Sequence, residues 1–247
     1  MIRIENVTKY HEGRVVIDDV TLTIDAHTNV GLIGPGGAGK SVLLKIVCGL
    51  ITPDRGKVFI DDIDVHSLKP TELAELRFRI GMLFQNYALF DSMNVADNIA
   101  FPLRQAGESD ETLVAQKVQQ ALKDISLPGI GDRYPNELSG GMKKRVSFAR
   151  AVIRRPPIVF YDDPTAGLDP VTSSKIFILL RTMQRDFDTT SVTISHDIEG
   201  IKDICDRFVL LDQGRIVFEG TRAEIDACQD SLVSQFWQGY SDDELNV

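Results

Sequence analysis

Residues 34–41, with the sequence GPGGAGKS, constrain the fold of this chain more than any other segment. They match the pattern G-x-x-x-x-G-K-[ST] and lie between the strand-like run VGLI and the run VLLKIV, whose apolar residues are spaced as on one face of a helix. Glycines in such a turn let successive backbone N–H groups surround phosphate oxygens, and the positive end of the helix dipole adds to the attraction. The sequence therefore predicts a strand, a phosphate-binding P-loop and a helix. A glycine-rich turn with an incidental lysine is the alternative.

The P-loop pattern also predicts the ligands of this loop. Lys40 is expected to neutralise the β- and γ-phosphates of a bound nucleotide, and the Ser41 hydroxyl is expected to bind Mg²⁺. ATP and Mg²⁺ are therefore the predicted cofactors. The expected ATP-binding residues of the loop are Gly34, Pro35, Gly36, Gly37, Ala38, Gly39, Lys40, Ser41 and Val42.

A pair of acids, Asp162 and Asp163, follows the strand-like run PIVFY. An acid at the carboxyl end of a buried parallel strand lies beside the crevice where ligands bind, so Asp162 is the expected Mg²⁺ ligand that acts together with Ser41. In a chain without a P-loop, a turn residue or helix cap before Pro164 would be the better interpretation of Asp162.

The rest of the chain predicts an α/β fold. The runs PIVFYDD, TSVTISHD, RFVLLD and GRIVFEG predict strands that alternate with helices, which is the pattern of a parallel sheet. The alternating runs IRIENVT and VTLTI predict an antiparallel β subdomain near the N-terminus, and residues 94–155 have the pattern of a helical insertion. We therefore expect one domain with a nucleotide-binding core (1–93 and 156–220), a helical subdomain (94–155) and a C-terminal helical tail (221–247).

Composition and charge restrict the class of protein. The 247 residues are 43% hydrophobic, and the net charge of −9 argues against a general nucleic-acid binder, with a local basic run at Lys143, Lys144 and Arg145. The three cysteines have neither disulfide nor metal-ligand spacing, so we expect them to be buried in a protein of a reducing compartment. No run is long enough to span a membrane, and MIRIENVTKY lacks a signal-like apolar region, so a cytosolic location is expected.

Four further motifs occur along the chain in a specific order. They are LFQNYALF with Gln85, LSGGM at 138–142, AGLD at 166–169 and SHD with His196. In this order and spacing, and together with the P-loop, they resemble the nucleotide-binding subunit of an ABC transporter. The resemblance covers nearly the whole chain, and five ordered motifs are far more specific than any one of them. It implies a RecA-like parallel-sheet core around the P-loop and ATP hydrolysis coupled to transport.

The resemblance also implies a homodimer that encloses two ATP molecules. Ser139, Gly140 and Gly141 open a predicted helix, so Ser139 is expected to cap that helix while its exposed N–H groups meet an anion. In the family this anion is the γ-phosphate held by the other chain. An ordinary serine-capped helix after a loop is the alternative.

Three more residues receive roles by the same resemblance. Gln85 reaches Mg²⁺ and the attacking water, His196 contacts the γ-phosphate and orients the water, and Tyr10 stacks on adenine. The residues after Gln85 belong to the segment that touches the membrane partner. The alternatives are a solvated loop glutamine, a structural histidine and a plain exposed tyrosine.

Asp163 departs from the family pattern, in which a glutamate follows the Mg²⁺-binding aspartate and polarises the attacking water. Aspartate keeps the carboxylate but withdraws it by one methylene group, about 1.5 Å. A displacement of about 1 Å costs about 100-fold in rate, or roughly 2.7 kcal/mol of barrier. We therefore expect a slow ATPase with Asp163, His196 and Gln85 as catalytic residues. An ATP-gated dimerisation clamp that hardly hydrolyses ATP is the alternative.

The stretches MLFQNYALFDSMNVADNIAFPLR and ELSGGMKKRVSFARAV resemble the ATPases of Mla- and Mce-type phospholipid transporters, as does the tail SLVSQFWQG. This branch implies integral membrane permease subunits, a Mce-type substrate-binding protein, and a position on the cytoplasmic face of the inner membrane. An importer of an amino acid or another small solute is the alternative. Phe236 and Trp237 of the tail are expected to pack on a partner, on the second chain or in the core.

Other classes with these motifs fit the sequence less well. ABC-type ATPases of chromosome maintenance and DNA repair separate their two halves by long coiled coils, and the segment between Ser41 and Ser139 is too short for one. A sensor that only reports ATP by dimerising ranks below an ATPase, because all the site groups except one methylene of Asp163 are present.

Overall fold

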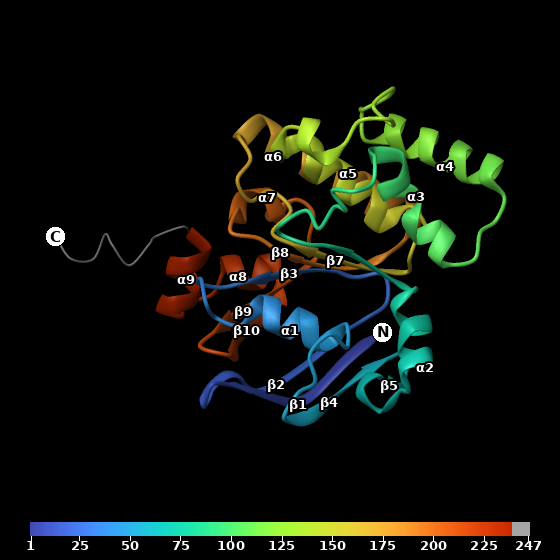
Figure 1. The fold of residues 1–247 in the computed structure, drawn as a ribbon. Coiled ribbons are helices and arrows are strands. Elements are labelled where there is room, and N and C mark those ends of the chain that lie inside the picture. Colours follow the sequence, from blue (N-terminus) through green and yellow to red (C-terminus); the bar gives the residue numbers. More distant parts are fainter. Residues whose placement is uncertain (239–247) are drawn as a thin grey trace. The chain divides into compact units, whose positions relative to one another are not determined.

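The antiparallel strands near the N-terminus form as their alternating sequence predicts. In the computed structural model, which describes residues 1–238, β1 (Ile2–His11) pairs on one side with β2 (Arg14–Ile24) and on the other with β4 (Arg55–Ile60), which pairs in turn with β5 (Ile63–Asp64). Ile2 and Ile4, two residues apart in β1, are both buried, as expected for the inner face of a strand. These four strands form the predicted antiparallel β subdomain (Figure 1).

The strand that leads into the P-loop belongs to the same compact unit, which comprises Met1–Arg77 and the chain from Thr190 onward. In this unit β3 (Asn29–Ile33) lies between β8 (Thr190–Ile194) and β9 (Arg207–Asp212) and is parallel to both, while β10 (Arg215–Thr221) is antiparallel to β9. β3 and β8 are almost entirely buried, as expected for parallel strands covered on both faces. The helices are α1 (Lys40–Val47), a 3₁₀ turn (Val65–Ser67), α2 (Pro70–Arg77), α7 (Ile198–Lys202), α8 (Arg222–Asp226) and α9 (Ser231–Gln238).

The second compact unit, Phe78–Thr189, contains the helices predicted between residues 94 and 155. Its strands β6 (Ile80–Leu83) and β7 (Ile158–Asp162) form a parallel pair. Its four α-helices begin at polar residues whose side chains accept a hydrogen bond from the first turn, namely Asn94, Asp110, Ser139 and Asp169. The helices are α3 (Val95–Gln105), α4 (Glu111–Asp124), a 3₁₀ turn (Pro135–Glu137), α5 (Gly140–Val152) and α6 (Pro170–Phe187), shown in Figure 1. The division into core, helical subdomain and tail stays a prediction.

One expectation about individual side chains, that all three cysteines are buried, was wrong. Cys48 and Cys205 are buried, but Cys228 is partly exposed because it lies in the irregular segment between α8 and α9. In the basic run at 143–145, Lys144 is fully buried and Arg145 donates to the carbonyl oxygen of Ile125 at 3.1 Å.

The tail packs on its own unit as far as residue 238. Trp237 is buried, its Nε1 donates to Asp226 Oδ1 at 2.6 Å, and its ring meets that of Phe208 edge to face with centroids 4.8 Å apart. This contact favours core packing over an outward-facing role for Trp237. Residues 239–247 of the predicted tail lie outside the described residues. Within residues 1–238, every helix is too short or too polar to cross a bilayer.

Candidate functional site

The P-loop is fixed in place by two glycines that lie against neighbouring backbone. Gly34 has φ 143° and Gly39 has φ 102°, conformations that other residues rarely adopt. A Cβ atom on Gly34 would lie 2.0 Å from the carbonyl oxygen of Leu211 in β9, and one on Gly39 would lie 2.6 Å from that of Val16 in β2. Only glycine therefore fits at these two positions, and the loop is held against both sheets of its unit.

The middle of the loop is open. Gly36 and Gly37 are exposed, and a Cβ atom built on either would meet nothing within 4 Å. At the start of α1, Gly39 supplies no side-chain cap and the first turn holds no acid, so the dipole end of the helix is not neutralised by the helix's own residues. An open loop before a helix start without acids has the properties that an anion-binding loop needs.

Lys40 is held inside this loop. The residue is 6% exposed, and its ammonium donates to the carbonyl oxygens of Gly34 at 2.6 Å and Pro35 at 2.8 Å. These contacts place a positive charge among the same backbone groups that would surround a phosphate. Among the other expected loop residues, Pro35 is exposed, Ala38 is buried, and Ser41 and Val42 are half-buried in the first turn of α1.

Tyr10 and His196 belong to the same unit as the P-loop. Tyr10 lies near the end of β1 opposite Val15 and is 40% exposed, and its backbone N–H donates to Asp54 Oδ2 at 2.7 Å, which lowers the pKa of that carboxyl. His196 is exposed in the turn between β8 and α7. Asp197 caps α7 by accepting from the N–H of Gly200. Both side chains are therefore accessible to a ligand, Tyr10 from the end of a strand and His196 from a turn.

The acidic pair lies in the second unit at the end of β7. Asp162 is the last residue of the strand and Asp163 follows it, and both are almost fully buried. Asp163 has φ 49°, a left-handed conformation that is uncommon for a residue other than glycine. Its carbonyl oxygen accepts from the N–H of Ala166 at 3.3 Å and from Lys144 Nζ at 2.9 Å. The strand end therefore turns sharply at the residue that is predicted to activate water.

Gln85 and Asp163 are brought together through Lys144. Gln85 is exposed just after β6, and its carbonyl oxygen accepts from Lys144 Nζ at 2.9 Å, so one ammonium bonds to the main chain of both predicted catalytic residues. Burial lowers the pKa of Lys144, and the negative charges of Asp163 and Asp162 oppose that effect. The structure thus joins two predicted site residues that are far apart in the sequence.

The segment 139–141 opens α5 as predicted. Ser139 caps the helix, its Oγ accepting from the N–H of Met142 at 3.3 Å, and the first turn contains no acid. A Cβ atom on Gly140 would lie 3.1 Å from the Tyr87 hydroxyl, and one on Gly141 would lie 2.7 Å from Thr172 Cγ2. These glycines therefore permit close packing of α5 against the segment after Gln85 and against α6.

Sequence reasoning missed the face of α5 that holds the segment after Gln85. Ser147 Oγ donates to the carbonyl oxygen of Tyr87 at 2.7 Å, and Arg150 donates to the same oxygen at 3.2 Å. A signal was present: Lys144 lies four residues before Phe148 and eight before Val152, both buried, so helical spacing places this lysine on the inward face. The residues predicted for the site are thus divided between the unit of the P-loop, Tyr10 and His196, and the unit of Gln85, Ser139 and the acidic pair.

Comparison with known proteins gives a consistent result. The sequence pattern of the family described as ABC transporter matches residues 17–166. The intermembrane phospholipid transport system ATP-binding protein MlaF of Haemophilus influenzae is 35% identical over 242 residues, which are 98% of this chain and 92% of MlaF. The methionine import ATP-binding protein MetN 1 of Bacillus thuringiensis subsp. konkukian is 40% identical over 224 residues, which are 89% of this chain but only 66% of MetN 1.

A solved structure supports the same fold. The ATP-binding cassette MJ0796, in a dimeric post-hydrolysis state bound to ADP and Pi, matches with a TM-score of 0.84 and 33% identity. The match covers 90% of this chain and 98% of MJ0796.

Proposed function

On the premise that this chain belongs to the ABC transporter family and is an ATP-hydrolysing subunit of it, we propose that it drives a permease that moves phospholipid. The observation that carries the phospholipid assignment is the match to MlaF over almost the full length of both chains. MetN 1 has a higher identity to this chain than MlaF has, so a small-solute importer is the second candidate. The match to MetN 1, however, covers only 66% of that protein.

The working form in this proposal is a homodimer. MJ0796 is dimeric in the state that holds ADP and Pi. In this chain the P-loop offers open backbone at Gly36 and Gly37, and the start of α5 offers N–H groups at Gly140 and Gly141 with no acid in its first turn. Two anion-binding sites of this kind in one chain are suited to hold the same triphosphate from opposite sides, one from each chain.

The residues fit ATP and Mg²⁺. Within the described part of the chain no group of three or more His, Cys, Asp or Glu side chains could hold a metal ion by itself. A nucleotide-bound Mg²⁺ does not need such a group, because it takes a hydroxyl, one or two carboxylates, phosphate oxygens and water. Ser41 and Asp162, with Gln85, would hold it, and the ion would neutralise charge on the β- and γ-phosphates.

The protein's own residues supply the remaining chemistry. Lys40 exchanges its bonds to the carbonyl oxygens of Gly34 and Pro35 for phosphate oxygens, and Tyr10 stacks on the adenine ring. Asp163 accepts a proton from the attacking water, and His196 orients that water against the γ-phosphate. Because the Asp163 carboxylate is one methylene shorter than that of glutamate, hydrolysis is slow. The alternative to a slow ATPase is an ATP-gated dimerisation clamp, which closes on ATP and hardly hydrolyses it.

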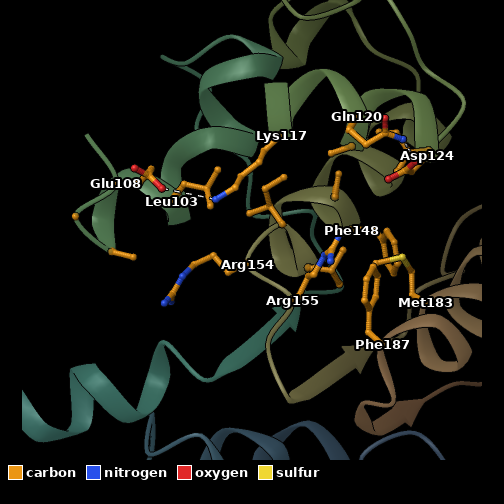
Figure 2. A pocket seen from close by; sticks show the side chains of 17 residues that line it. Leu103, Glu108, Lys117, Gln120, Asp124, Phe148, Arg154, Arg155, Met183 and Phe187 are labelled. Atoms are coloured by element: carbon orange, nitrogen blue, oxygen red, sulfur yellow. Dashed lines mark hydrogen bonds and ion pairs between the residues drawn. The ribbon is translucent and has the colours of Figure 1, made fainter. Parts of the chain in front are cut away.

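A cavity of about 670 Å³ in the second unit is suited to the permease. It lies among α3, α4, α5 and α6, and Figure 2 shows Phe148, Met183 and Phe187 gathered on one side and the Lys117–Glu108 ion pair on the other. Arg154 and Arg155 also line it, and their guanidinium groups lie over the rings of Phe78 and Phe187. The groove has an apolar floor, and its rim carries the cations Lys117, Arg154 and Arg155 together with the acids Glu108 and Asp124. Such a groove accommodates a short amphipathic helix whose polar edge carries charges of both signs. We assign this groove to such a helix of the permease, in addition to the contact expected for the segment after Gln85. The two contacts would hold the chain on the cytoplasmic face of the membrane.

The test of the phospholipid assignment is to purify the protein with its membrane partners and identify what the complex carries. Phospholipid bound in near-stoichiometric amount, together with an ATPase rate that changes when phospholipid is added, supports the proposal. A lipid-free complex whose rate responds to an amino acid or another small solute overturns it in favour of the importer.

A further inference from the structure

Lys144 occupies an unusual position for a lysine. It lies in the second turn of α5, is fully buried, and donates to the carbonyl oxygens of Gln85 and Asp163, each at 2.9 Å. Its ammonium is also 5.4 Å from the centre of the Tyr87 ring. A buried ammonium is costly unless hydrogen bonds and opposite charge compensate it, and here both are present, because Asp162 and Asp163 attract it.

The two segments that Lys144 joins are both held in uncommon backbone conformations. Tyr87 and Ala88, just after Gln85, have φ 59° and 51°, and Asp163 has φ 49°. Left-handed conformations of residues other than glycine persist only where the surroundings hold them, and they cluster at functional sites. The carbonyl groups that Lys144 bonds are therefore those of segments that need external support.

The neighbouring polar residues on α5 provide a contrast. Ser147 and Arg150 both donate to the carbonyl oxygen of Tyr87, so they support the segment after Gln85. Lys144 bonds instead to Gln85 itself and to Asp163 at once. Loss of the Ser147 bond would loosen one segment, whereas loss of the Lys144 ammonium would separate the two.

We propose that Lys144 is a positioning residue for ATP hydrolysis, whose buried ammonium fixes the main chain of Gln85 relative to that of Asp163. This inference rests on the proposed role of Asp163 as the group that accepts the proton from water. The position of the Asp163 main chain is especially important, because the aspartate carboxylate is already farther from the attacking water than a glutamate carboxylate would be. Any further displacement would lower the rate again. Lys144 does not touch the nucleotide in this account, so it sets the rate of hydrolysis and not the affinity for ATP.

The experiment compares Lys144→Met with Ser147→Ala in the complete protein and its membrane complex. Methionine has a similar volume and removes both the charge and the two hydrogen bonds. We expect Lys144→Met to lower kcat by about 30-fold or more while the KM and Kd for ATP change less than about 3-fold. Ser147→Ala, the matched control, should lower kcat less than about 3-fold. An unchanged kcat in Lys144→Met, or equal losses in kcat and in ATP affinity, overturns the proposal.

Two further variants keep the test decisive if Lys144→Met fails to fold. Lys144→Arg retains the charge and donors, and Lys144→Gln retains a donor without the charge, so the rate should fall in the order wild type, Arg, Gln. Equal rates for the three proteins would overturn the proposal.

A double variant separates this inference from the proposed role of Asp163. If Lys144 acts through Asp163, adding Lys144→Met to Asp163→Asn lowers the single-turnover rate by less than about 2-fold, because the two residues then act as one unit. Independent, multiplicative losses would overturn the positioning role alone. A rate unchanged by Asp163→Asn would overturn both the role of Asp163 and the inference that rests on it.

Discussion

The Tyr87 hydroxyl and Gly140 approach so closely that a Cβ atom at Gly140 would lie 3.1 Å from the hydroxyl oxygen. The contact joins the segment after Gln85 to the start of α5. In the proposed homodimer, the start of α5 binds the γ-phosphate of the ATP that the other chain holds. Tyr87 has little freedom to withdraw, because its backbone is left-handed and its carbonyl oxygen accepts from Ser147 and Arg150.

Gly140→Ala should therefore lower ATP hydrolysis by about tenfold while the free energy of unfolding changes by less than about 1 kcal/mol, since alanine is favoured in helices. Adding Tyr87→Phe removes the crowded hydroxyl and should restore part of the rate. Steady-state phosphate release and thermal unfolding of the three proteins check this. If the phenylalanine restores nothing, crowding by Tyr87 is not the cause.

The glycines of the P-loop should divide into two classes. Gly34→Ala would place Cβ 2.0 Å from the carbonyl oxygen of Leu211 at φ 143°, so it should destabilise the fold by about 3 kcal/mol. Gly36→Ala meets no protein atom and should change stability by about 0.5 kcal/mol or less. It should weaken ATP binding about tenfold or more, because the methyl group obstructs the approach of a phosphate. Urea unfolding and nucleotide titration distinguish the two; similar effects from both substitutions would contradict this division.

These contrasts show how much the sequence predicts. The strand, loop and helix around Lys40 follow from local spacing, and so does the cap at Ser139, because each depends on neighbours a few residues away. The left-handed turns at Tyr87 and Asp163 and the burial of Lys144 depend on contacts between segments distant in the sequence, which spacing alone does not reveal. The same is true of Trp237, whose packing is decided by Asp226 and Phe208.

The cysteines should differ in reactivity. Burial raises the pKa of the Cys48 thiol to about 12 and also raises that of Cys205, so both remain protonated and inaccessible at neutral pH. Cys228 is partly exposed and should be the site that an alkylating reagent labels in the folded protein. Mass spectrometry of the labelled protein should find one modification before unfolding and three after. Rapid labelling of Cys48 in the native state would contradict the described packing.

The groove assigned to the permease predicts a position-specific effect on α4. Gln120 is exposed and lines the cavity, whereas Gln119 is exposed and does not. Gln120→Trp should fill part of the groove and reduce co-purification of the membrane partner by about tenfold or more. Gln119→Trp is the matched control, and both proteins should keep the ATPase rate of the isolated chain. Equal recovery of the partner with both variants would place the docking surface elsewhere.

The central claim is that Asp163 sustains slow ATP hydrolysis, and the most direct measurement is phosphate release by the purified complex, its Asp163→Asn variant and its Asp163→Glu variant. We predict measurable release by the native complex, a fall in Asp163→Asn to a small residual rate that single-turnover measurement still resolves, with ATP binding intact, and an increase of up to about 100-fold in Asp163→Glu. Release at background in the native complex, restored only by glutamate, would contradict this account and identify an ATP-gated clamp.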